Sequence, residues 1–175
     1  MQYFGSLVGF ILIVTAFRHI KGKLSNKDMY CEIEISFLGY TTNVTAIIDT
    51  GNMLKEPITG VSVIVVEKEK LQNILPEYIL DHLEDVMEGG LEYDKYLSKF
   101  RVIPFSSLGK ENGMLLGFKP DSVKIYFDTE EKDVNAIVGI YEKKLSKTGA
   151  YNGLVGLDVL ESEGEVNEYI TDIKV

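Results

Sequence analysis

The stretch that decides the fold is Ala46-Ile47-Ile48-Asp49-Thr50-Gly51-Asn52, in which an apolar run ends directly at an acidic residue. Residues 44–48 are rich in β-branched and apolar side chains and predict a strand. Asp49 is therefore expected where that strand becomes a loop. Asp-x-Gly is also ordinary turn chemistry, so a plain β-turn is one interpretation of the triplet.

Each residue of the triplet has a physical role if it forms half of an active site. Two aspartate carboxylates brought to about 3 Å cannot both ionise, so one acts as a base while the other acts as an acid. Gly51 allows its N–H to approach the carboxylate of Asp49, and Thr50 can hydrogen-bond across a two-fold axis. The sequence contains one Asp-Thr-Gly triplet, so two chains must each supply one carboxylate.

A second apolar element lies late in the chain, Leu154-Val155-Gly156-Leu157-Asp158-Val159-Leu160. Taken alone, it is equally an ordinary strand-to-helix turn. In this order, the two elements resemble the retroviral-type aspartic peptidases, in which the strand that bears the Asp loop packs under a late strand. That late strand turns through a glycine into a short helix. The resemblance implies a catalytic Asp49, an active-site loop supported by its neighbours, and a late strand-helix element; the supporting residues are Thr50, Gly51 and Asn52, and the late ones are Leu154, Val155, Gly156 and Leu157.

The chain departs from the wider retroviral pattern at two positions that normally pair. That family usually has an acidic residue two positions after its glycine and an arginine after the late glycine, where this chain has Met53 and Leu157. Because both charges are missing together, we expect an apolar contact in place of the ion pair. The stretch from Leu54 to Phe100 is longer than in minimal retroviral enzymes, and Gly89-Gly90 is the predicted flap or loop tip.

The N-terminus is unlike the rest of the chain. Tyr3 to Phe17 is almost entirely apolar, and the basic run Arg18, His19, Lys21 and Lys23 follows at once. This pattern predicts the end of a membrane span with the remainder on the cytoplasmic side. The run is shorter than the roughly 20 residues that cross a bilayer, so a buried core helix is the alternative.

The remaining sequence predicts a mainly β domain, a barrel or a sandwich with minor helices, preceded by a partial transmembrane helix. The resemblance to the retroviral-type peptidases implies that it is a retropepsin-like β-barrel. Short β-rich runs predict strands at residues 31–37, 44–48, 61–66, 100–105, 114–118, 123–127 and 134–140. Residues 67–87 predict one or two surface helices, interrupted at Pro76, and Gly39-Tyr40 predicts a turn. The expected organisation is a membrane segment (1–21), a linker (22–29), a peptidase domain (30–161) and an acidic tail (162–175).

A closer resemblance joins the N-terminal span, the basic linker, the Asp49 stretch with Asn52 in place of the usual Ser or Ala, and Arg101-Val102-Ile103-Pro104-Phe105-Ser106-Ser107-Leu108-Gly109. These features resemble the sporulation sigma-E factor processing peptidases of endospore-forming bacteria. The resemblance implies a membrane-embedded N-terminal half and an aspartic peptidase domain on the mother-cell side. It also implies three partners besides the membrane: a second copy of the chain, a pro-sigma factor substrate, and an activating signalling protein from the forespore.

Composition excludes several other functions. The 18 basic and 27 acidic residues give a net charge of −9, which works against binding to a phosphate backbone, so no nucleic acid is expected. A single cysteine, Cys31, and two widely separated histidines, His19 and His82, predict neither a metal site nor a cofactor. Two alternatives stay open: a noncatalytic β-domain of the same fold that binds or scaffolds a partner, and a membrane-tethered β-module whose Asp-Thr-Gly is only a turn.

Overall fold

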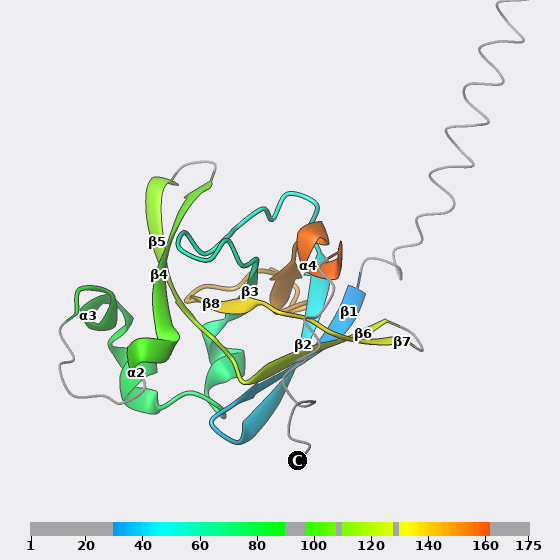
Figure 1. Cartoon of the computed structure of the whole chain (residues 1–175), viewed down its shortest axis with the longest axis horizontal. Coiled ribbons are helices and arrows are strands. Elements are labelled where there is room, and N and C mark those ends of the chain that lie inside the picture. The colour runs from blue at the N-terminus through cyan, green and yellow to red at the C-terminus, as the bar shows by residue number, and fades with distance from the viewer. Residues whose placement is uncertain (1–29, 90–96, 108–109, 128–129, 162–175) are drawn as a thin grey trace, which may run out of the picture.

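The computed structural model describes residues 30–89, 97–107, 110–127 and 130–161. These residues form a mainly β domain with a few short helices, as the sequence predicted (Figure 1). The described part contains nine strands, which are β1 (Tyr30–Phe37), β2 (Tyr40–Ile48), β3 (Val63–Glu67), β4 (Phe100–Ser107), β5 (Lys110–Phe118), β6 (Ser122–Phe127), β7 (Glu130–Asp133), β8 (Ile137–Tyr141) and β9 (Gly153–Val155).

All nine strands belong to one sheet, in the order β4-β5-β8-β3-β9-β2-β1-β6-β7. The sheet is open, with β4 and β7 at its two edges. The short late strand β9 lies between β2 and β3, parallel to β2 and antiparallel to β3. Because of this insertion, β9 pairs directly with β2, the strand that ends before Asp49.

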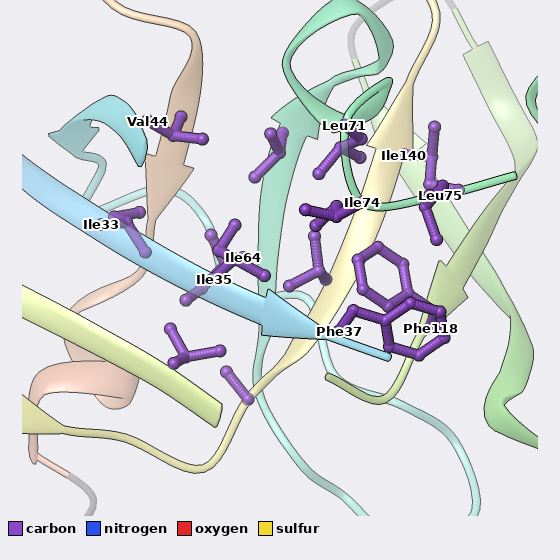
Figure 2. Close-up of a cluster of buried hydrophobic side chains, with 14 of the residues drawn as sticks. Ile33, Ile35, Phe37, Val44, Ile64, Leu71, Ile74, Leu75, Phe118 and Ile140 are labelled. Atoms are coloured by element: carbon purple, nitrogen blue, oxygen red, sulfur yellow. The ribbon is translucent and has the colours of Figure 1, made fainter. Parts of the chain in front are cut away.

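The sheet curls so that distant strands share one core. β1 and β3 are not neighbours in the sheet, yet Ile33 and Ile35 of β1 face Ile64 of β3 in the same buried cluster (Figure 2). At the far end of this cluster the rings of Phe37 and Phe118 pack edge-on, with centroids 4.8 Å apart. Aromatic pairs at such distances add to the free energy gained from burial alone.

Strand β3 is buried on both faces, which explains its continuous β-branched sequence. Ile64 and Val66 point into the main core, whereas Val63 and Val65 belong to a second apolar cluster on the opposite face. Alternate residues of a strand point to opposite sides, so a strand covered on both sides needs apolar residues throughout.

The β1–β2 hairpin turns one residue earlier than the sequence predicted. Leu38 and Gly39 occupy the turn with φ values of 53° and 82°, and Tyr40 already begins β2. Positive φ at both central positions suits the right-handed twist of the paired strands. The carboxylate of Asp121 accepts the N–H of Leu38 at 2.6 Å and so holds this bulky residue in an unusual conformation.

The helices are short and lie at the periphery. The 3-10 helix η2 (Lys68–Leu71), α2 (Glu77–Asp81) and α3 (Leu83–Met87) occupy the region where one or two surface helices were predicted, and α2 begins directly after Pro76. The others are η3 (Leu97–Lys99) and α4 (Leu157–Glu161). Figure 1 shows α2 and α3 beside the base of the β4–β5 hairpin, while α4 lies near the end of β2.

Within the described ranges, no helix combines the length and the apolar character that crossing a bilayer requires. The predicted membrane segment, Tyr3 to Phe17, lies outside the residues that the structure describes. The same holds for the basic linker and for the predicted acidic tail after Glu161.

Candidate active site

Asp49 stands where β2 leaves the sheet, as the sequence predicted. Ala46, Ile47 and Ile48 of β2 pair in parallel with Gly153, Leu154 and Val155 of β9. The N–H of Asp49 continues this ladder by donating to the carbonyl of Val155 at 2.8 Å. The backbone of Asp49 is therefore fixed by the late strand, while its side chain is only partly buried.

The Asp-Thr-Gly triplet forms a tight turn around its own carboxylate. The N–H of Gly51 donates to Oδ1 of Asp49 at 2.9 Å, and the N–H of Asn52 donates to the carbonyl of Asp49 at 3.0 Å. A Cβ on Gly51 would lie 3.2 Å from that same Oδ1, so a side chain there would crowd the carboxylate. Thr50 and Gly51 are exposed, so the loop presents the carboxylate at the surface of the single chain.

Asn52 ties this loop to two strands of the sheet. Its side chain is buried, and its Nδ2 donates to the carbonyls of Val63 in β3 and Leu154 in β9, at 3.1 and 3.4 Å. Its Oδ1 accepts the N–H of Leu54 at 3.3 Å. A serine or alanine could not span these groups, so Asn52 has a structural role of its own in this chain.

The backbone of the late element packs closely against the backbone of the loop at Gly156. Gly156 follows β9 directly, and a Cβ on it would lie 2.3 Å from the backbone oxygen of Asn52. Glycine is the residue that allows such a close approach of two backbone segments. The helix α4 then begins at Leu157. The structure thus joins the two sequence elements through contacts of Asp49 with Val155 and of Asn52 with Leu154 and Gly156.

The positions that lack the retroviral ion pair are both exposed. Met53 is 79% exposed and Leu157 is 44% exposed in the single chain. The sequence predicted that an apolar contact between Met53 and Leu157 replaces the ion pair, but neither side chain is buried. Met53 and Leu157 therefore expose apolar surface on the two segments that meet at the Asp49 loop.

The loop after the triplet contains a buried carboxylate that sequence analysis did not identify. Glu56 is 1% exposed, and it accepts the N–H groups of Ile58 and Thr59 and the hydroxyl of Thr59. The hydroxyl of Thr59, ahead of the opposing effect of burial, lowers the pKa of Glu56 below its usual value. The spacing Glu-x-x-Thr is the only local signal for this turn, and it is a common one.

An apolar cluster extends from the hairpin β4–β5 to the Asp49 loop. Its buried members are Val63, Val65, Ile103, Leu115 and Ile137. Leu54, Phe105 and Leu154 pack on it while keeping part of their surface exposed. Two of these three, Leu54 and Leu154, are also hydrogen-bonded through their backbones to Asn52, so the apolar surface borders the active-site loop.

The other sequence candidates lie apart from this site. Gly89 ends α3 with a φ of 79°, and its neighbour Gly90 lies outside the described residues. His82 contacts Asp85 on the exposed side of α3. No group of three or more His, Cys, Asp or Glu side chains that could hold a metal ion is present among the described residues.

Comparisons with known proteins identify a family. The sequence pattern of the family described as sporulation factor SpoIIGA matches residues 2–159. The chain is 38% identical over 133 residues to the protein named probable sporulation sigma-E factor-processing peptidase from Clostridium acetobutylicum, covering 76% of this chain and 42% of that protein. It is 31% identical over 132 residues to the sporulation sigma-E factor-processing peptidase of Priestia megaterium, covering 73% of this chain and 43% of the relative.

The sporulation sigma-E factor-processing peptidase of Bacillus subtilis is 32% identical over 123 residues, or 66% of this chain and 39% of the relative. The matched region thus spans about two fifths of the length of these three relatives. No solved structure matches the chain.

Proposed function

The chain belongs to the family of the sporulation factor SpoIIGA, and we propose that it is an aspartic endopeptidase whose catalytic group is Asp49. The observation that carries the proposal is the hydrogen bond from the N–H of Gly51 to Oδ1 of Asp49, at 2.9 Å, in a loop anchored beneath by Val155. This arrangement fixes one carboxylate oxygen and leaves the group accessible from the surface. A peptidase that works through water needs a carboxylate held in this way.

The active enzyme is a homodimer with one Asp49 from each chain. The single Asp-Thr-Gly triplet and the exposure of Thr50, Gly51, Met53 and Leu157 support this assembly. In a two-fold dimer the same patch meets itself, so Thr50 of one protomer reaches the loop of its partner. The apolar side chains around the carboxylates are then withdrawn from water, which adds to the free energy of association.

The mechanism requires no metal ion and no nucleophilic side chain. The two Asp49 carboxylates share one proton because they cannot both be charged at close range. The ionised member removes a proton from a water molecule held between them, and that water attacks the scissile carbonyl. The protonated member donates a hydrogen bond to the developing oxyanion, and the N–H of Gly51 keeps each carboxylate in orientation. The carboxyl that took the proton from water then gives it to the amide nitrogen, so that the C–N bond breaks and the amine leaves.

The hairpin β4–β5 is the segment best placed to cover a bound peptide. Figure 1 shows it extending from the body of the domain, near the loop that follows β2. Its Phe105 belongs to the apolar cluster that also includes Leu54 and Leu154. We assign the covering role to this hairpin in place of Gly89-Gly90, because Gly89 merely ends a helix on the periphery.

The substrate we propose is an inactive sigma factor, from which the enzyme removes an N-terminal pro-segment during sporulation. The names of the relatives from Priestia megaterium and Bacillus subtilis support this assignment. We also propose that residues before about Lys23 attach the chain to the membrane with the peptidase domain on the cytoplasmic side. A signalling protein from the forespore activates it there.

Coexpression of the full chain with a pro-sigma factor from the same genome tests the function. The proposal predicts a shortened sigma factor with the wild-type chain and none with Asp49→Asn. Asp133→Asn, which changes an exposed carboxyl of β7, is the matched control and should cleave normally. Cleavage by Asp49→Asn at the wild-type rate would refute the aspartic mechanism, whereas binding without cleavage by the wild type would favour a noncatalytic module.

A further inference from the structure

Asp158, in the first turn of α4, bridges the late element and the loop that follows the active site. Its Oδ2 accepts a hydrogen bond from the hydroxyl of Ser62 at 2.8 Å and lies 3.6 Å from Nζ of Lys55. Its Oδ1 lies over Gly156, because a Cβ built on that glycine would be 2.7 Å away. The Asp158 side chain is 32% exposed, and Ser62 is buried.

The segment that Asp158 contacts leads back to Asp49 through backbone hydrogen bonds. Lys55 and Ser62 form an isolated β-bridge, and next to it the N–H of Val63 donates to the carbonyl of Leu54 at 2.9 Å. Leu54 in turn donates to Oδ1 of Asn52. The loop after Asp49 is therefore connected to α4 at its far end by Asp158.

The other half of the connection passes through β9. The N–H of Asp49 donates to Val155, and the N–H of Val159 donates to the carbonyl of Gly156 at 3.2 Å. The loop after Asp49 is thus connected to β9 at both ends. Asp49 bonds to Val155 directly, and Ser62 bonds to Asp158 of α4, which follows β9. Ser62 and Asp158 are joined through their side chains, as are Lys55 and Asp158.

Of the two contacts that Asp158 makes, the one to Ser62 is the stronger. Lys55 is 54% exposed and its Nζ lies at the far limit of an ion pair, so it adds little free energy. The Ser62 hydroxyl donates to a charged acceptor at short range in a partly buried position, and such bonds are roughly twice as strong as neutral ones. The ion pair of Lys55 and Asp158 nevertheless joins the loop after Asp49 to α4. These are the two segments that contain Met53 and Leu157, where the charged pair of the retroviral enzymes is missing.

We propose that Asp158 is a positioning residue for the reaction, which holds α4 against the loop of Asp49 through the Ser62 hydroxyl. The proposal rests on the peptidase function proposed above. Asp158 acts on the carboxylate of Asp49 only through the backbone of Val155 and of the loop. Without it, α4 is held less firmly against the loop, and the carboxylate loses part of its fixed orientation although the bonds of Asp49 to Val155 and of Asn52 to Leu154 remain.

The experiment compares variants of the full chain in pro-sigma factor cleavage and in amide hydrogen exchange, the main ones being Asp158→Ala, Ser62→Ala, Asp158→Asn and Lys55→Met. Asp158→Ala and Ser62→Ala should each lower kcat by about tenfold to hundredfold with KM little changed, because misplacement of a catalytic group mainly affects the transition state. The Ser62→Ala/Asp158→Ala double variant should be no worse than either single one, since both remove the same link. Asp158→Asn keeps an acceptor for Ser62, so it and Lys55→Met should remain within about threefold of wild type.

Hydrogen exchange gives a readout that does not depend on cleavage. In the Asp158→Ala and Ser62→Ala variants, amides of residues 50–56 should exchange about tenfold faster, whereas those of β1 and β6 should not change. Asp81→Ala, which removes a carboxylate from the surface pair with Lys68, is the control and should alter neither measurement. If Asp158→Ala does not fold, Ser62→Ala tests the same link.

Unchanged exchange at residues 50–56 in Asp158→Ala and Ser62→Ala would overturn the positioning role, even if the wild type cleaves normally. A loss of activity in Asp158→Asn as large as that in Asp158→Ala would also overturn the positioning role. The side-chain oxygen that accepts the hydrogen bond from Ser62 would then be present without restoring activity. If the wild-type chain cleaves no pro-sigma factor at all, the proposed peptidase function fails, and the exchange rates still decide whether Asp158 fixes the loop.

Discussion

The N–H of Asp49 donates a hydrogen bond to the carbonyl of Val155, 2.8 Å away, and so joins the active-site loop to the last strand of the sheet. The strand that precedes Asp49 lies early in the sequence, but the position of Asp49 also depends on β9, which lies between β2 and β3. Substitutions in the late element should therefore affect the loop as strongly as substitutions in the loop itself.

Gly156→Ala should destabilise the fold. The new Cβ would lie 2.3 Å from the oxygen of Asn52, and a backbone atom cannot move aside as the end of a side chain can. Overpacking of this kind typically costs about 1–3 kcal/mol of unfolding free energy. Urea denaturation followed by circular dichroism measures the loss, with Glu161→Ala at an exposed position of α4 as the control. A midpoint equal to that of the wild type would contradict the close approach.

Asn52→Ala should also destabilise the chain, because it leaves the N–H of Leu54 and the carbonyls of Val63 and Leu154 without their partner. Unsatisfied buried groups cost about 1–3 kcal/mol. Asn135→Ala, at an exposed position, controls for the loss of an asparagine and should change little.

Asn52→Asp should be worse than Asn52→Ala at neutral pH, because it places a carboxylate against two carbonyl oxygens. That repulsion raises the pKa of the new carboxyl above the ordinary value of about 3.9. The unfolding free energy of Asn52→Asp should therefore be lower than that of Asn52→Ala at neutral pH. This difference should shrink as the pH falls through the raised pKa. Unfolding free energies of the two variants between pH 4 and pH 7 would reveal a constant difference if Asn52 did not face these carbonyls.

Glu67 should make stability depend on acid pH. It is 2% exposed, and burial by itself would raise its pKa, but hydrogen bonds from the N–H of Leu145, the amide of Asn152 and the ammonium of Lys144 outweigh burial and lower it. A carboxyl whose pKa is lower in the folded chain stabilises it above the unfolded value near 4.5 and loses this effect as the pH falls. The wild type should thus lose this contribution below about pH 4.5.

Glu67→Gln is the variant that tests this dependence. At pH 7 it should be less stable than the wild type, because the amide nitrogen cannot accept the hydrogen bond from Asn152. The difference should narrow between pH 5 and pH 3, where the wild-type carboxyl takes up a proton. Glu69→Gln, an exposed neighbour that also contacts Lys144, is the control. If the difference in unfolding free energy between the wild type and Glu67→Gln does not change with pH, the carboxyl of Glu67 does not make stability depend on acid pH.

The sequence predicted the mainly β fold and the placement of Asp49 and Gly156 at strand ends, but not the order of the strands, and the reason lies in the range of the interactions. Asp49 and Gly156 are recognisable because each sits in a short local pattern of apolar strand, turn and glycine. Strand β7 was missed because its sequence, Glu130–Asp133, is entirely charged, and its pairing with β6 depends on the tertiary position of an edge. The open order of the sheet likewise follows from pairings between distant segments.

Side chains that act through tertiary contacts could not be predicted from local patterns. Ser62 and Asp158 lie far apart in the sequence, and each alone has the properties of an ordinary turn or helix-start residue. The buried carboxylate of Glu67 ends a β-branched run and begins a charged segment, so it was assigned to a helix surface. Its role depends on Leu145 and Asn152, which reach it from the loop before β9.

Mixing wild-type chains with an excess of Asp49→Ala chains should suppress cleavage. In the proposed mechanism each active site needs two carboxylates and a mixed dimer has one, so activity should fall with the square of the wild-type fraction when pairing is random. The substitution removes a partly buried side chain in a loop, so the variant should fold and still pair through Thr50, Met53 and Leu157. It also removes charge repulsion between the two loops, and pairing should be at least as strong as in the wild type.

The measurement uses full chains carrying two different affinity tags, so that mixed dimers can be isolated and counted before cleavage is assayed. Asp133→Ala, added at the same excess, is the control, and it should leave activity in proportion to the total of competent chains. Asp49→Ala combined with Thr50→Ala should suppress less than Asp49→Ala alone, because the loop contact across the two-fold axis is weakened. If wild-type activity is unchanged while mixed dimers are abundant, the two chains do not share one active site, because a single Asp49 would then suffice for the reaction.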